Sequence, residues 1–276
     1  MQLFFIRHAQ SKNNALYSSG RGGEIRSHDP ALTELGRRQA ACLAEGLARA
    51  NPGLATDQAD SQNRAGFGLT HIYCSLMLRA VATGTAVADR LGLPLHAWLD
   101  WHEEGGLYLD GPNGERLPVA GPGRADFARD YPRLVLPDDL TDAGWWLRPV
   151  TSPAERLANN PAERPATDLA EQPANDPAER LAERPFEEQP QRPLRAQRVL
   201  AELLARHTNP DDRVAVISHG GFYNHIIGAL TEQPLPYRLN HLLNNTSISR
   251  VALTAQGNYL VYQNRCEHLP DDMITY

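Results

Sequence analysis

The stretch QLFFIRHA at residues 2–9 decides how this chain folds. Residues 3–6 are apolar and β-prone, and the run ends abruptly at Arg7 and His8. Because open α/β sheets bind ligands at the carboxyl ends of their strands, a buried strand that ends in Arg-His delivers both side chains to a ligand. A guanidinium holds phosphate oxygens and a neutral imidazole can attack phosphorus, so the pair suits phosphate chemistry. Alone it is weak evidence, and the rest of the chain must supply partners.

Composition predicts a globular protein with no membrane span. The chain has 276 residues, 41% of them hydrophobic, and no run approaches the roughly 18 apolar residues that a spanning helix needs. Three cysteines (Cys42, Cys74 and Cys266) are scattered without metal-type spacing, so we expect reduced thiols and a cytoplasmic location. A net charge of −6 argues against nucleic acid as a partner.

Residues 153–188 contain three tandem copies of a twelve-residue unit, PAERLANNPAER, PATDLAEQPAND and PAERLAERPFEE. A regular helix cannot pass through the recurring prolines, and one Leu-Ala pair per copy is too little apolar content to offset the ordering entropy. Nine acids and four arginines give the segment a net charge of −5. We therefore expect a mostly disordered surface insertion; a partner-binding arm is the alternative.

Two more predicted strands lead into polar side chains. Residues 69–74 form the first, and Ser75 is expected to cap a helix that runs to about Leu91 with Arg79 in its first turn. A helix N-terminus carries free N–H groups, so Arg79 lies where an anion is already favoured. Residues 94–99 form the second strand, and Glu103 follows it in a loop.

The strongest buried-strand pattern, at residues 213–217, ends in Ser218 and His219. Since the carboxyl ends of parallel strands lie along one edge of a sheet, groups distant in sequence can meet there. Helices are expected over about 34–50, 194–207 and 222–230.

The domain organisation follows from these elements. We expect one domain over residues 1–276, with a covering, loosely helical subdomain at about 107–150 and the insertion at 153–188. The region 107–150 is rich in Gly and Pro and carries the aromatic pair Trp145 and Trp146, which is more typical of a core than of a substrate platform.

Five segments, in order, resemble the histidine phosphatase superfamily, also called phosphoglycerate mutase-like. They are Arg7-His8-Ala9-Gln10-Ser11 with Asn14, Leu32-Thr33-Glu34-Leu35-Gly36 with Gln39-Ala40, Ser75-Leu76-x-x-Arg79-Ala80 with Thr83, His102-Glu103 before Gly105-Gly106, and Ser218-His219-Gly220. The resemblance covers about residues 1–110 and 194–265. It implies a three-layer α/β/α fold with a mostly parallel central sheet.

The resemblance also implies a role for each matching residue. His8 would be the nucleophile and become transiently phosphorylated. Glu103 would protonate the leaving alkoxide and then deprotonate the attacking water, although the adjacent Glu104 remains open as an alternative. The groups around the phosphoryl oxygens would be Arg7, Asn14, Arg79 and His219, with His219 also counted as catalytic. No metal and no cofactor is expected, because cationic side chains supply the positive charge.

Two departures from the family pattern bear on the reaction. Ala9 replaces the more usual glycine, and Gln10 stands where mutases typically carry glutamate. We therefore predict a phosphomonoesterase that acts on a small phosphorylated metabolite, or less favourably on a phosphoprotein, with no nucleic acid and no membrane as partner. The alternatives are a phosphoglycerate mutase-type phosphoryl transfer and a catalytically silent protein that binds through its acidic repeat. The presence of every expected catalytic residue type counts against the silent protein.

Overall fold

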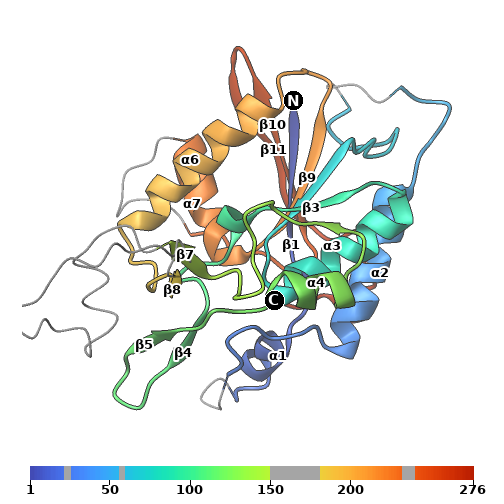
Figure 1. Ribbon diagram of the computed structural model, residues 1–276. Coiled ribbons are helices and arrows are strands. Elements are labelled where there is room, and N and C mark those ends of the chain that lie inside the picture. Colours follow the sequence, from blue (N-terminus) through green and yellow to red (C-terminus); the bar gives the residue numbers. More distant parts are fainter. Residues whose placement is uncertain (22–25, 56–59, 150–180, 232–239) are drawn as a thin grey trace, which may run out of the picture.

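The computed structural model describes residues 1–21, 26–55, 60–149, 181–231 and 240–276 (Figure 1). Its helices and short 3₁₀ turns are α1 (Lys12–Ser18), α2 (Glu34–Ala48), α3 (Leu78–Leu91), η1 (Leu99–Trp101), α4 (Arg124–Asp130), α6 (Gln191–Arg206), α7 (Gly220–Leu230) and η3 (Asp271–Met273). Its strands are β1 (Gln2–Arg7), β2 (His71–Cys74), β3 (Leu95–Ala97), β4 (Tyr108–Asp110), β5 (Arg116–Pro118), β6 (Leu134–Val135), β7 (Leu147–Pro149), β8 (Leu181–Glu183), β9 (Arg213–Ser218), β10 (Ile248–Thr254) and β11 (Gly257–Arg265).

Within the described residues, seven strands form the central sheet, in the order β11-β10-β1-β9-β2-β3-β6. Five neighbouring strands run parallel: β1, β9, β2, β3 and β6. The β10–β11 hairpin joins the sheet antiparallel, with β10 next to β1. In register, Arg7 at the end of β1 lies opposite Ser218 at the end of β9. The predicted mostly parallel α/β sheet is confirmed.

Strand β1 shows why the sheet is covered on both faces. Its side chains alternate, as a strand requires: Phe4 and Ile6 pack into a core with α2 and α3, whereas Leu3 and Phe5 pack into a core with α6 and α7. All four side chains are buried. Figure 1 shows α2 and α3 on one side of the sheet and α6 and α7 on the other, which is the expected three-layer arrangement.

The carboxyl ends of the parallel strands meet at one edge, close to α1 and the β4–β5 hairpin (Figure 1). His8 follows β1, and its backbone N–H donates to the Ser218 carbonyl at the end of β9. Ser75 follows β2, and its N–H donates to the Ile217 carbonyl. Sequence segments far apart in the chain are therefore joined at this edge by backbone hydrogen bonds.

The prediction that Ser75 caps the following helix was wrong by two residues. Helix α3 begins at Leu78 with Met77 as its N-cap residue. Ser75 instead accepts a hydrogen bond from the Met77 N–H through its hydroxyl (3.2 Å). Arg79 still lies in the first turn of α3, so the prediction about its position is unaffected.

Two predictions about the region after residue 107 need correction. The segment 107–150 is not simply a helical cover, because β6 extends the central sheet and β4–β5 forms a separate hairpin. The predicted insertion 153–188 extends too far, because residues 181–188 are ordered on the domain: β8 pairs with β7, and Glu187 is buried. The remainder, 153–180, lies outside the described residues.

Candidate active site

His8 is fixed as a neutral imidazole with a defined tautomer. Its Nδ1 lies 2.7 Å from the Ala9 carbonyl oxygen, which can only accept, so Nδ1 carries the proton. Its Nε2 therefore holds the lone pair and accepts from Arg79 Nε at 3.1 Å. Burial, together with the guanidiniums of Arg79 and Arg7, lowers the pKa of His8 well below its usual value. The unprotonated Nε2 is the atom that a phosphorus nucleophile requires.

His219 lies beside His8, with the two ring centroids 5.1 Å apart. Its Nε2 lies 2.9 Å from the Ser75 hydroxyl. The Ser75 hydroxyl can donate to this nitrogen, and in that tautomer the His219 proton is on Nδ1. This Nδ1 is buried and has no hydrogen-bond partner in the part of the chain that the structure describes. It is an unfilled donor beside the candidate nucleophile.

Arg7 and Arg79 bring two guanidiniums to the same pocket. Arg7 donates through Nη1 to the Leu243 carbonyl, while its Nε is buried without a partner among the described residues. Burial lowers the pKa of Arg7 to about 10, which leaves it charged at neutral pH. Arg79 lies 3.8 Å from the Asp29 carboxylate through Nη1. His8, Arg7, Arg79 and His219 are thus brought together, as the sequence predicted.

The other residues of the opening motifs hold the loop after His8 in place. Gln10 donates its backbone N–H to Gln39 Oε1 (2.8 Å) and accepts from the Thr33 hydroxyl at its own side-chain oxygen (2.6 Å). Gly36 comes so close that an added Cβ would lie 2.1 Å from the Gln10 carbonyl oxygen. Asn14 lines the pocket, but its Oδ1 caps α1 by accepting from the backbone N–H of Ser11.

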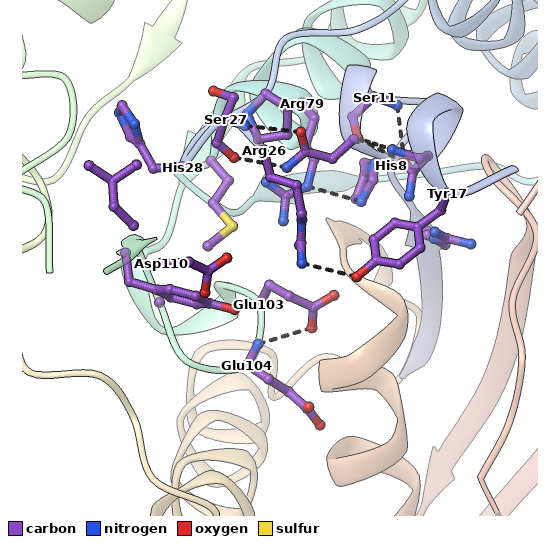
Figure 2. A pocket seen from close by; sticks show the side chains of 18 residues that line it. His8, Ser11, Tyr17, Arg26, Ser27, His28, Arg79, Glu103, Glu104 and Asp110 are labelled. Carbon is purple, nitrogen blue, oxygen red and sulfur yellow. Dashed lines mark hydrogen bonds between the residues drawn. The ribbon is translucent and has the colours of Figure 1, made fainter. Parts of the chain in front are cut away.

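The structure separates Glu103 from Glu104. Glu103 lies in a loop, and its carboxylate contacts the start of α7. Its Oε1 accepts from the Phe222 N–H (2.9 Å) and its Oε2 from the Gly221 N–H (3.3 Å). Glu104 forms ion pairs with Arg192 (3.0 Å) and His225 (2.5 Å). Figure 2 shows the Glu103 carboxylate turned into the pocket and Glu104 turned away from its centre.

Two residues at the candidate site were missed in the sequence. Arg26 lines the pocket directly, and nothing in its glycine- and serine-rich surroundings distinguishes it. Asp29 is buried beside Arg79 and accepts from the Leu78 N–H at the start of α3 (3.0 Å). Burial raises the pKa of Asp29 to about 7, against the opposing effect of Arg79. Asp29 therefore holds both Arg79 and the helix that carries it.

The segment 184–195, here called the bracing segment, contacts the residues next to Glu103 and the residue that binds its carboxylate. Arg195 forms a buried two-pronged ion pair with Glu187 (2.6 and 2.7 Å) and donates through Nη1 to the carbonyls of Asp100 (2.7 Å) and His102 (2.9 Å). Its guanidinium also lies 3.8 Å from the ring centroid of Phe222, the residue whose N–H holds Glu103. This support could not be predicted from the sequence, because Glu187 belongs to the repeat.

The bracing segment also contacts the glycine turn after Glu103. The ring of Phe186 packs on Tyr108 at a centroid distance of 4.9 Å. It covers Gly105, whose φ of +81° favours glycine and whose added Cβ would lie 2.3 Å from that ring. The Glu187 N–H donates to the Gly105 carbonyl (3.1 Å). The final residues of the third repeat thus pack against the candidate active site.

Among the described residues, one group has the composition of a metal site. His71, His207 and Asp212 offer ligand atoms within 4.8 Å of one another, and none of the three lines the pocket. His207 is already bonded on both ring nitrogens, to Asp212 (2.8 Å) and to the Tyr73 hydroxyl (3.1 Å). This hydrogen bonding fits a packing role for His207.

The model of the histidine phosphatase superfamily (branch 1) matches residues 3–113 and 154–265 of this chain. The first matched part contains the site residues from Arg7 to Glu103, and the second contains those from Glu187 to His219. No curated protein sequence matches the chain significantly. Among the helices of the described residues, none combines the length and apolar character needed to cross a bilayer.

Solved structures of low sequence identity share the fold. A putative α-ribazole-5′-phosphate phosphatase from Escherichia coli is 17% identical, with a TM-score of 0.55 and coverage of 96% of this chain and 98% of that one. A phosphoserine phosphatase from Entamoeba histolytica is 16% identical (TM-score 0.53, coverage 98% and 99%). A mycobacterial glucosyl-3-phosphoglycerate phosphatase is 19% identical (TM-score 0.50, coverage 95% and 98%).

Proposed function

Because this chain belongs to the histidine phosphatase superfamily, we propose that it hydrolyses phosphomonoesters through a phosphohistidine on His8, without a metal ion. Family membership and the phosphatases among its structural neighbours support a phosphoric monoester hydrolase. Beyond this activity, we propose the phosphohistidine intermediate, the residues that act on it and the kind of substrate.

The observation that carries the proposal is a set of unfilled donors around one lone pair. His8 Nε2 has no proton, and the buried atoms Arg7 Nε and His219 Nδ1 have no partner among the described residues. Buried donors are normally satisfied, since leaving one unpaired costs about 1–3 kcal/mol. A phosphoryl group bound at His8 supplies the oxygens that these donors lack.

In the first step, the lone pair of His8 Nε2 attacks phosphorus and the ester P–O bond breaks. Arg7, Arg79 and the His219 Nδ1–H hold the phosphoryl oxygens while charge redistributes. Arg79 can move its donors from His8 Nε2 to the phosphoryl group as that lone pair is used. The leaving alkoxide takes a proton from the Glu103 carboxyl, which acts as the general acid of this step.

In the second step, Glu103 takes a proton from water, and the hydroxide attacks the phosphohistidine. The N–P bond breaks, inorganic phosphate leaves, and His8 is again neutral. The backbone N–H groups of Gly221 and Phe222 hold the Glu103 carboxylate in place while it takes this proton.

We propose a small phosphorylated metabolite as the substrate. The pocket has a volume of about 230 Å³, which is below the roughly 300–1,000 Å³ of pockets that hold drug-sized ligands. The glucosyl-3-phosphoglycerate phosphatase and the phosphoserine phosphatase carry the names of small phosphorylated compounds.

The test measures phosphate release from para-nitrophenyl phosphate by the wild-type protein and His8→Ala, with and without EDTA. We expect wild-type activity that the chelator does not change, a loss of about 10⁴-fold or more in His8→Ala, and an acid-labile phosphoryl group on His8 after rapid quenching. Full activity in His8→Ala contradicts the mechanism. Loss of activity with EDTA indicates a metal enzyme, and phosphoryl transfer without phosphate release indicates a mutase.

A further inference from the structure

We propose that Arg26 forms a second anion-binding subsite, and that the preferred substrates are phosphomonoesters whose short organic part carries a carboxylate or a second phosphate. This inference rests on the proposed function and identifies the substrate class of that site. It assigns a role to the pocket arginine that the phosphoryl-transfer steps do not use.

Arg26 is held in the pocket with part of its guanidinium unfilled. Its Nη1 donates to the Tyr17 hydroxyl (3.0 Å), and its Cζ lies 5.0 Å from the Tyr17 ring centroid. Its Nε is buried and has no partner in the described part of the chain. Figure 2 shows Arg26 reaching towards Tyr17, while Arg79 reaches towards His8.

The acids that line the pocket do not neutralise Arg26. Glu104 pairs with Arg192 and His225, and Asp110 pairs with Arg116. Glu103 is bonded to backbone N–H groups. No ion pair joins Arg26 to a carboxylate among the described residues, although its charge is close enough to lower the pKa of Arg79 further.

The backbone around Arg26 is fixed in advance. Asn13 bonds the next residue, Ser27, twice: its Nδ2 donates to the Ser27 carbonyl (2.8 Å) and its Oδ1 accepts from the Ser27 N–H (3.2 Å). Asn13 is buried in α1, the helix that follows the candidate nucleophile. A guanidinium that is already positioned loses little entropy when it binds an anion.

The charge balance places the second anion on the substrate. The transferred phosphoryl group already has Arg7, Arg79 and the His219 Nδ1–H as donors. Arg26 is a further cation in a pocket of about 230 Å³, so an anion that reaches it lies within a few bonds of the phosphoester. A guanidinium binds both carboxylate and phosphate oxygens well, and it gains less from a neutral hydroxyl.

The experiment compares three synthetic esters with the same propyl chain: 3-hydroxypropyl phosphate, 3-(phosphonooxy)propanoate and propane-1,3-diyl bisphosphate. We expect the wild-type kcat/KM for at least one anionic ester to exceed that for the hydroxyl ester by about 10- to 100-fold, the range for hydrogen bonds to charged groups. The two anionic esters distinguish a carboxylate from a phosphate as the preferred group.

Three variants test the assignment. Arg26→Gln should reduce the ratio of the anionic to the hydroxyl ester at least about 10-fold, and Arg26→Lys should restore part of it. Tyr17→Phe removes only the acceptor that orients Arg26 and should reduce the ratio less. Arg37→Gln, an exposed arginine that pairs with Glu34 on α2, is the matched control and should leave the ratio and the activity unchanged.

A wild-type ratio near one, or an unchanged ratio in Arg26→Gln, overturns the subsite. An equal loss on all three esters in Arg26→Gln also overturns it, since Arg26 would then serve the transferred phosphoryl group. If the wild-type protein turns over none of the esters, the proposed function fails instead. Calorimetric binding of the same esters to His8→Ala then decides the subsite separately, and equal affinity for all three overturns it.

Discussion

His8 and Glu103 line the same pocket, but different parts of the fold hold them in place. His8 follows a fully buried central strand, and its neighbours Arg79 and His219 are attached to the same sheet edge. Glu103 lies in a loop, held by the start of α7 and by the bracing segment, whose first residues belong to the repeat. The site for phosphoryl binding is therefore part of the core, whereas the candidate proton donor depends on packing from a peripheral segment.

Because the supports differ, phosphoryl binding and proton donation can be disturbed separately. Damage to the core side should affect every phosphoester. Damage to the Glu103 side should affect mainly esters whose leaving group needs a proton, because an acidic phenol leaves without one. Dependence on the leaving group is thus the measurement that distinguishes the two regions.

The largest effect expected on the Glu103 side comes from Glu103→Gln. We expect the hydrolysis of an alkyl phosphate to fall about 10²- to 10⁴-fold, the range for general acid–base catalysis, while 2,4-dinitrophenyl phosphate loses far less in its first step. Rapid-quench measurement of phosphohistidine formation isolates that step. The same substitution at Glu104 should show no leaving-group dependence, and the reverse result would assign the proton donor to Glu104.

Glu187→Ala tests the support behind Glu103. Removing one partner of a buried ion pair should destabilise the protein by about 3–5 kcal/mol, because the Arg195 charge is left buried. If the bracing segment positions Glu103, alkyl esters should lose more activity than 2,4-dinitrophenyl phosphate at a temperature where the variant is folded. Denaturant unfolding measures the first effect and paired kinetics the second.

The exposed ion pair between Arg198 and Asp100 is the matched control for Glu187→Ala. Arg198→Met should change the stability by less than about 1 kcal/mol, as exposed pairs do, with no dependence on the leaving group. Equal losses on both esters in Glu187→Ala would mean that the bracing segment serves stability alone.

Asp29 tests the core side through pH. Its folded pKa of about 7 is raised from 3.8, so the folded state binds the proton more tightly than the unfolded state does. Its contribution to stability is therefore lost as pH rises from about 4 to about 7. Relative to wild type, Asp29→Asn should gain on the order of 1–3 kcal/mol between about pH 5 and about pH 8. Urea unfolding at both values measures this, and a constant difference would contradict it.

The smallest effect is expected from shortening the repeat. Deletion of 153–180 leaves the bracing segment intact, so turnover should stay within about twofold, as for surface changes away from a site. Deletion of 153–188 removes Glu187 and should resemble Glu187→Ala. Activity assays of the two deletions side by side measure the difference. Equal turnover in both would show that the bracing segment is dispensable.

The sequence predicted the core side of this comparison well. Apolar strands that end in Arg7-His8 and Ser218-His219 are compatible with few sheet topologies. Thr33 and Gly36 in the second motif are explained by their contacts with Gln10. These features are local patterns or follow from the parallel sheet. The position of Arg79 in the first turn of its helix was predicted for the same reason.

The Glu103 side could not be predicted because its contacts are long-range and its composition is misleading. Glu187 lies in a proline-rich acidic repeat, and its place in the core depends on its pairing with Arg195 in the fold. Arg26 lies in a loop with no periodicity, and its place in the pocket depends on the Asn13–Ser27 contact. Charge alone does not distinguish either residue from a surface side chain.

The pairing of β7 with β8 has a consequence for how this protein can vary. Pro149 lies opposite Leu181, so the two points that flank residues 150–180 are neighbours on the domain. Lengthening such a closed loop is thermodynamically cheap, at about 0.6 kcal/mol for each doubling. Unequal recombination could therefore add or remove twelve-residue units without moving the catalytic scaffold. The same point offers a place to graft a fluorescent reporter or an affinity tag.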